Sequence, residues 1–192
     1  MWRKTMKEIQ IPKAFQPFLG EKITVNALIL VVVFSLGMTL LTLYIAKPLF
    51  EALPVLNQVL LILIMIDVYG GIVANFFPSV KAYYDLHPFM KKVFVFLHVH
   101  PFIIIWLSGL EFRIAFILYA VIIGSHVLVR LMKKRNHQEL LAIFFNLLAA
   151  VLIYDTLQPI PAYLSLLLFA LFVKLIYGFS VDLIPQKKDE VL

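Results

Sequence analysis

The second apolar run of the chain, residues 52–77, reads ALPVLNQVLLILIMIDVYGGIVANFF. It is long enough to cross the roughly 30 Å hydrocarbon core of a bilayer as a helix, which takes about 20 residues. One ionisable side chain, Asp67, lies well inside it. Such a group needs a polar partner or water, because a charge in lipid is costly. The run therefore predicts a membrane-spanning helix and, within it, an internal polar site.

Five more runs of this kind accompany it, so that the six lie at 23–46, 52–77, 93–108, 112–132, 138–156 and 162–181. The chain of 192 residues is 62% hydrophobic and 15% charged, with a mean hydropathy of +0.96. Soluble domains lie near about 45–50% and 25%. The sequence therefore predicts an all-α, polytopic membrane protein with six transmembrane helices. Short connections make consecutive helices antiparallel neighbours.

The distribution of Lys and Arg predicts the orientation of the chain. Fourteen of the 17 cations fall before the first run, between the second and third, between the fourth and fifth, or after the sixth. Only Lys47 and Arg113 fall on the opposite side, and Lys174 lies within the sixth run. Because cytoplasmic segments carry the excess of positive charge, we expect both termini in the cytoplasm.

Three segments follow from this topology. Residues 1–22 form a cytoplasmic interfacial segment, residues 23–182 the transmembrane bundle, and residues 183–192 a cytoplasmic tail. The first segment mixes Lys with Trp and Phe and is broken at Pro12 and Pro17, which favours a position at the membrane surface. Residues 78–92 have a similar mixture and are expected at the same interface.

Polar residues in the spans gather in the cytoplasmic half. At about 1.5 Å per residue, Asp67 lies roughly 15 Å from the cytoplasmic boundary, and His98 and His100 roughly 8–12 Å. The main candidates for a binding site or proton relay are Asp67, His98, His100, His126 and Lys174. Supporting polar positions are Asn75, Tyr119, Asn146 and Tyr177. Small residues beside Asp67 and Lys174 indicate that both face the bundle interior.

Each candidate also has a structural interpretation. The long side chain of Lys174 can carry its amine to the lipid headgroups at the membrane surface. The sequence supports this position and a position inside the bundle equally. Asp67 has no such escape, and its natural partner is Lys174 or a histidine, in an ion pair that can be structural as easily as functional. His126 can bond a neighbouring helix, and Asn146 can hold two helices together.

His98 and His100 resemble a metal chelate, but two residues apart on a helix they point about 200° away from each other. They can share an ion only if Pro101 distorts the turn. The sequence therefore predicts no metal and no cofactor. The less favoured alternatives are Zn or Fe, or a b-type haem, held by His98 or His100 together with His126.

Three functional classes stay open. The preferred one is binding or translocation of an ion or small molecule, that is, transport. The second is a non-catalytic regulator or assembly partner, and the third is an enzyme acting on a lipid or prenyl substrate through His or a metal. The chain has no cysteine and lacks the HExxH, GxSxG and phosphate-loop motifs, so whether it is an enzyme is left open.

The surroundings of the chain are predicted in the same terms. The lipid bilayer is the expected environment, the bacterial plasma membrane the expected location, and another membrane protein or a second copy a potential partner. The positive charge is explained by topology, so no nucleic acid is expected.

Overall fold

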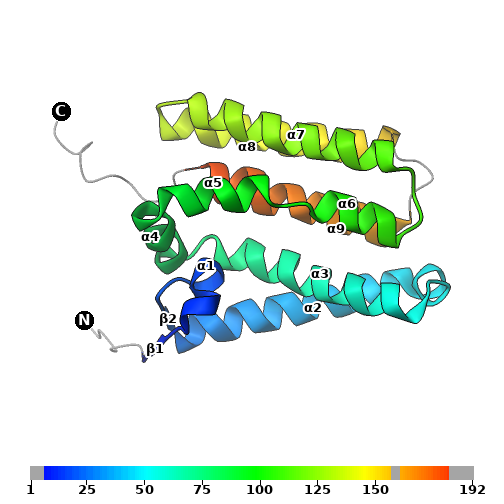
Figure 1. Ribbon diagram of the computed structural model, residues 1–192, viewed down its shortest axis with the longest axis horizontal. Helices are drawn as coiled ribbons and strands as arrows, with labels where there is room; N and C mark the ends of the chain where they lie inside the picture. The colour runs from blue at the N-terminus through cyan, green and yellow to red at the C-terminus, as the bar shows by residue number, and fades with distance from the viewer. Residues whose placement is uncertain (1–6, 157–160, 182–192) are drawn as a thin grey trace.

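The computed structural model describes residues 7–156 and 161–181 (Figure 1). The first six residues of the predicted N-terminal segment, residues 157–160 of the last outer connection, and the predicted tail at 183–192 lie outside this description.

Six helices are long and apolar enough to cross a membrane, as the sequence predicts. The first two are α2 (Val25–Glu51) and α3 (Val55–Ala74). The third span consists of α5 (Pro88–Phe96) and α6 (His100–Leu107). The fourth and fifth are α7 (Phe112–Leu131) and α8 (Arg135–Thr156). The sixth consists of α9 (Ala162–Phe172), the π-helical turn η2 (Val173–Tyr177) and α10 (Gly178–Ser180).

The spans differ from the predicted runs in three places. The first helix continues through Pro48 to Glu51, so the expected outer connection at 47–51 is helical. The third span is interrupted between Phe96 and His100. The sixth widens into a π turn around Lys174. A proline in the last helical turn interrupts only one backbone hydrogen bond, which explains why Pro48 does not end its helix.

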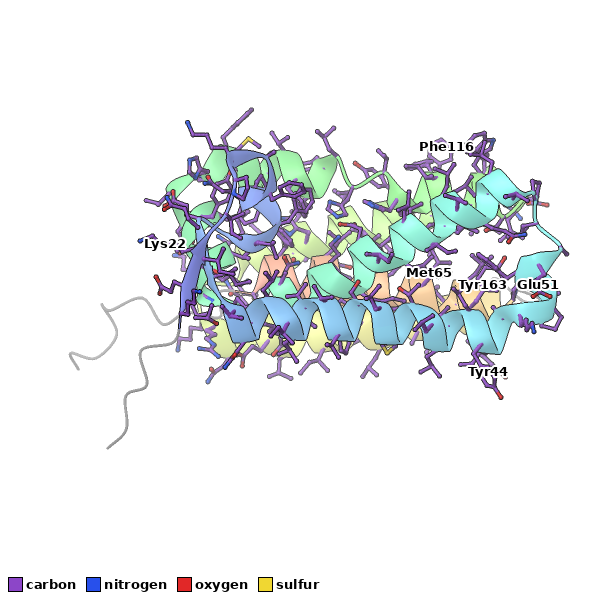
Figure 2. All side chains as sticks on the ribbon, turned by 90° about the horizontal axis from the view of Figure 1, so that it is seen from below. Lys22, Tyr44, Glu51, Met65, Phe116 and Tyr163 are labelled. Atoms are coloured by element: carbon purple, nitrogen blue, oxygen red, sulfur yellow. The ribbon has the colours of Figure 1, made fainter. Side chains whose placement is uncertain are left out.

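The sixth span lies at the centre of the bundle. Within its most apolar stretch 67% of the residues are buried, against 22–33% in the other five. It packs against α2, α3, α7 and α8, and in Figure 1 it runs behind α5 and α6. The other spans turn an apolar face outward, as Figure 2 shows around Tyr44. Any ionisable residue of the sixth span must therefore find its partners inside the protein.

The N-terminal segment folds over one end of the bundle. Two short strands, β1 (Glu8–Gln10) and β2 (Lys22–Thr24), pair antiparallel with Ile9 opposite Ile23. The 3₁₀ turn η1 (Lys13–Phe15) and helix α1 (Gln16–Leu19) lie between them, and α1 packs on α4 (Pro78–Leu86). This small sheet was not predicted from the sequence, because three-residue strands have no readable periodicity.

Two hydrogen bonds attach this segment to α4. The Tyr84 hydroxyl donates to the carbonyl of Pro17 at 2.8 Å, and the Ser79 hydroxyl donates to that of Leu19 at 3.2 Å. Burial, with a smaller contribution from Tyr83, raises the pKa of Tyr84 above its usual value, so its hydroxyl keeps the proton that it donates. The N-terminal segment is thereby held against the end of α3 that carries the candidate site.

Candidate functional site

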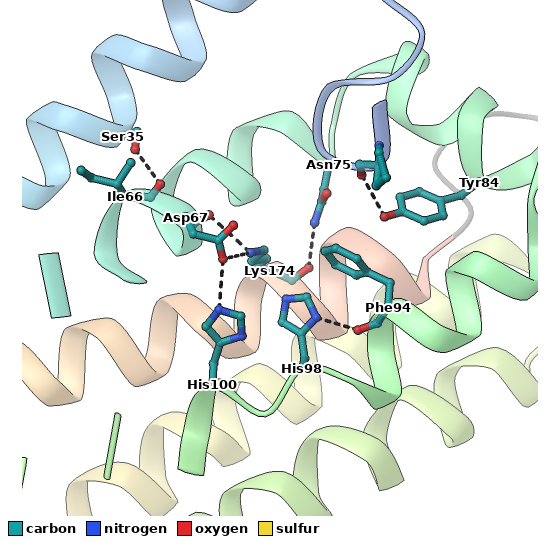
Figure 3. A network of polar contacts seen from close by, with 10 residues as sticks. Ser35, Ile66, Asp67, Asn75, Tyr84, Phe94, His98, His100 and Lys174 are labelled. Carbon is teal, nitrogen blue, oxygen red and sulfur yellow. Dashed lines mark hydrogen bonds and ion pairs between the residues drawn. The ribbon is translucent and has the colours of Figure 1, made fainter. Parts of the chain in front are cut away.

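Asp67 is the centre of a three-way contact within the spans (Figure 3). Its Oδ2 lies 2.6 Å from Lys174 Nζ and 3.2 Å from His100 Nε2. The side chain of Lys174 is only 1% exposed, whereas that of Asp67 is 30% exposed. The lysine therefore does not extend to the membrane surface, and the carboxylate that neutralises it is the accessible member of the pair.

The position of Lys174 depends on its neighbours in sequence and in space. Gly71 leaves room for the lysine stem, because a Cβ at that position would lie 2.8 Å from Nζ. In the π turn the Gly178 N–H donates to the carbonyl of Val173, five residues earlier, and Asn75 Nδ2 donates to the carbonyl of Lys174 at 3.3 Å. Gly71 on α3 therefore leaves space for the lysine, and Asn75 at the end of α3 bonds the irregular backbone that carries it.

The break in the third span brings His98 and His100 to the same place. A regular helix would point them about 200° apart. Here the chain leaves helical geometry between Phe96 and His100, and α6 begins at His100 with Pro101 as its second residue. The two rings lie side by side, with centroids 4.8 Å apart and planes inclined by 32°. Pro101 therefore provides the distortion without which the two histidines could not share a ligand.

Each histidine is oriented by one ring nitrogen and leaves the other without a hydrogen-bond partner. His98 Nδ1 lies 2.7 Å from the carbonyl of Phe94, and His100 Nε2 contacts Asp67. His98 Nε2 and His100 Nδ1 are buried and have no partner among the described residues. Buried polar atoms are paired in the great majority of cases, so two such atoms side by side indicate a ligand site.

Two cavities reach this cluster. One, of about 310 Å³, is lined by Asp67, Gly71, Asn75 and Lys174 together with α1 and Phe94. The other, of about 390 Å³, is lined by Asp67, His98 and His100 and by α5. Both include Phe18 and Phe94, whose rings meet edge to face with centroids 6.2 Å apart. Asp67 therefore borders both cavities, and the rings of Phe18 and Phe94 line both of them as well.

The other predicted polar residues lie elsewhere. His126 Nδ1 bonds the Ser180 hydroxyl at 2.8 Å, so it holds α7 to α10. Asn146 donates to the carbonyl of Ala142 on its own helix at 2.8 Å. The Tyr119 hydroxyl donates to the carbonyl of Phe96 at 2.6 Å, next to the break, and Tyr177 packs against Phe76. The cluster therefore unites Asp67, Lys174, His98 and His100, with Asn75 beside it.

The metal alternatives change with this geometry. His126 was predicted as the ligand opposite His98 or His100, but in the structure its Nδ1 bonds the Ser180 hydroxyl. Among the described residues, the group that offers three potential metal ligands is Asp67, His98 and His100, whose ligand atoms lie within 4.8 Å of one another.

Two residues of the site were missed by sequence reasoning. Phe94 accepts from His98 through its carbonyl and forms part of both cavities, and Phe18 covers them. The i, i+4 spacing of Phe94 and His98 was available in the sequence as a signal. Nothing in the sequence distinguishes Phe18 from the other aromatic residues of a surface anchor.

Comparison with protein-family models, with curated proteins and with solved structures gives no significant match in any of the three.

Proposed function

We propose that this protein binds a small ion or small molecule at Asp67 and carries it across the membrane. The observation that supports this most is a buried lysine whose carboxylate partner is open to two cavities. A cation that enters either cavity can therefore reach the carboxylate. Here only the lysine is closed away.

The backbone around the site supports the same proposal. Transporters often place binding sites at interrupted helices near the middle of the membrane, where irregular backbone lines a cavity. The third span is interrupted at His98, and the sixth span widens at Lys174. These two irregular segments and α3 meet at Asp67, so small changes in either one alter access to the carboxylate.

We also propose the orientation that the cation distribution predicts, with both termini in the cytoplasm of a bacterium and the site nearer the cytoplasmic face. The described strands, α1 and α4 then lie on that side (Figure 1). In this arrangement the N-terminal segment covers the cytoplasmic approach to Asp67.

Ion currents from the purified protein in liposomes on a solid-supported membrane test the proposed function. Concentration jumps of H⁺, Na⁺, K⁺, Mn²⁺ and Zn²⁺ are applied to wild type and to Asp67→Asn. We expect a current for at least one ion in wild type and none in the variant, because an amide cannot balance a cation. Asp155→Asn, at an exposed aspartate of α8, is the matched control and should keep the current.

Two results would contradict the proposal. One is the absence of current for every ion from folded wild-type protein. The other is an unchanged current in Asp67→Asn. If Asp67→Asn instead prevents folding and wild type carries no current, the cluster is structural, as expected for a regulator or an assembly partner.

A further inference from the structure

We propose that Asp67, His98 and His100 bind a divalent first-row transition metal ion such as Zn²⁺, and that the ammonium of Lys174 competes with this ion for the carboxylate. This proposal rests on the proposed function, because it identifies the class of ion that the protein would carry. The site consists of four side chains from three spans, which Figure 3 shows around Asp67.

The tautomers of the two histidines leave metal-binding lone pairs in the buried cluster. A backbone carbonyl can only accept, so the Nδ1 of His98 must donate to Phe94, and the neutral ring then has its lone pair on Nε2. In the ion-free site the ionised Asp67 accepts from His100 Nε2. An ion bound to Asp67 replaces this hydrogen bond, and the proton of His100 moves to Nδ1, so that Nε2 offers its lone pair beside the carboxylate. His98 Nε2 and His100 Nδ1 have no partner among the described residues, so the first can bind the ion and the second can carry the proton.

The contact that fixes the tautomer of His98 is that of a prepared metal ligand. Histidines that bind metals commonly donate their second ring N–H to a backbone carbonyl or a carboxylate, which orients the ring. His98 has this arrangement, with the carbonyl of Phe94 as the acceptor. His98 is also 96% buried, being 4% exposed, and its free Nε2 faces the cluster rather than solvent.

A small contraction brings the donors to bonding distance. One ligand atom from each of the three residues lies within 4.8 Å of the others. Around tetrahedral Zn²⁺, with bonds of about 2.0–2.2 Å, ligand atoms lie roughly 3.4 Å apart. His98 and His100 flank Val99 at the break, where the backbone is not part of a helix. The break allows the two rings to close on an ion without bending a regular helix.

The third ligand is Asp67, and Lys174 is the group that must give way. Both side-chain contacts of Asp67 use Oδ2, so Oδ1 is available to an ion. Lys174 Nζ lies 2.6 Å from Oδ2 and 5.9 Å from the centre of the Phe94 ring. When an ion takes the carboxylate, the ammonium can move toward the aromatic face, where cations are attracted. Lys174 thus neutralises the charge of Asp67 whenever no metal ion is bound.

The donor set defines the class of metal. The chain has no cysteine, so thiolate ligands are excluded. Two imidazoles and a carboxylate suit Zn²⁺, Fe²⁺, Co²⁺ and Mn²⁺ better than Ca²⁺ or Mg²⁺, which prefer oxygen alone. Three protein ligands also leave a coordination position for water, as expected of an ion that must be released.

Binding of Co²⁺ to the detergent-purified full-length protein, followed by its visible absorption bands, tests the site without any measurement of flux. We expect one Co²⁺ per protein in wild type, displaced by Zn²⁺. His98→Gln and His100→Gln should each weaken binding at least about tenfold, because each removes one imidazole ligand. His126→Gln changes a histidine outside the group and should bind as wild type does.

Lys174→Met tests the competition. Removal of the ammonium should tighten Co²⁺ binding more than about tenfold, because a positive charge at this distance from the ion opposes it strongly. The same variant should unfold at a lower temperature without metal and recover when Co²⁺ is added, since the ion replaces the lost counter-charge. Unchanged or weaker binding in a folded Lys174→Met protein would refute the competition.

Two results would overturn the metal site itself. They are the absence of Co²⁺ bands in folded wild type at millimolar metal, and bands that persist unchanged in His98→Gln. A wild type that carries H⁺ or Na⁺ current but binds no Co²⁺ would refute the metal site alone. A wild type that binds Co²⁺ but gives no current would refute translocation and support the metal site.

Discussion

At the scale of single residues, Asp67 was the position that the sequence identified best. A carboxylate deep in an apolar run requires a partner, and the structure supplies Lys174 and His100. The choice between an internal and an extended Lys174 could not be predicted, because a lysine stem reaches either way from the same backbone position. Gly71 decides it in the structure, since only a residue without a Cβ leaves space for the amine.

Gly71→Ala should therefore separate the ion pair. The added methyl group would overlap the end of Lys174, and we expect a loss of about 1–3 kcal/mol in the free energy of unfolding, as for overpacking elsewhere. The matched control is Gly37→Ala, in a helix with nothing within 4 Å of the added Cβ. It should be neutral or slightly stabilising, because alanine favours helix. Thermal unfolding in detergent measures both, and equal melting temperatures would contradict the packing argument.

At the scale of elements, the sequence predicted the six spans closely but not their irregularities. Apolar length and flanking charges define where a helix must cross, and the predicted runs overlap all six helices. Pro101 indicated a distortion in the third span, yet the direction of His98 and His100 depends on how the backbone resolves it. The π turn at Lys174 has no signature in residue type, because it is stabilised by Asn75 from another helix.

Pro101→Ala should repair the break. Alanine restores an N–H that can donate to the carbonyl of Leu97 and removes the ring that blocks it. A continuous third helix would turn His98 and His100 to different faces. Hydrogen exchange followed by mass spectrometry should show slower exchange over residues 97–103, together with a weaker current. Pro88→Ala, at the first position of α5, is the control, because an N–H there has no helical acceptor. Unchanged exchange at 97–103 would show that Pro101 does not cause the break.

At the scale of the whole molecule, hydropathy and charge predict the number of spans and their orientation. They do not predict that the sixth span is the central helix, because its apolar composition resembles that of its lipid-facing neighbours. Its central position follows from which faces pack, and that is decided by tertiary contacts. The same position explains why Lys174, the lysine of the sixth span, lies in a buried pair.

The orientation predicts the outcome of labelling intact cells, which is simple to measure because the chain has no cysteine. A membrane-impermeant maleimide should label Lys47→Cys, at an exposed position near the outer end of α2, before the cells are opened. Lys133→Cys, between α7 and α8, should react only afterwards. The opposite pattern would reverse the topology and place the N-terminal segment outside.

The most direct test of the ion-binding role of Asp67 combines charge removal on both sides of the pair. Unfolding temperature and ion current are measured for wild type, Asp67→Asn, Lys174→Met and the double variant. Each single change leaves one charge of the pair without its counter-charge and should lower the unfolding temperature, and the double change should recover most of that loss. We predict that the double variant is folded but carries no current. A folded double variant with the current of wild type would contradict the account.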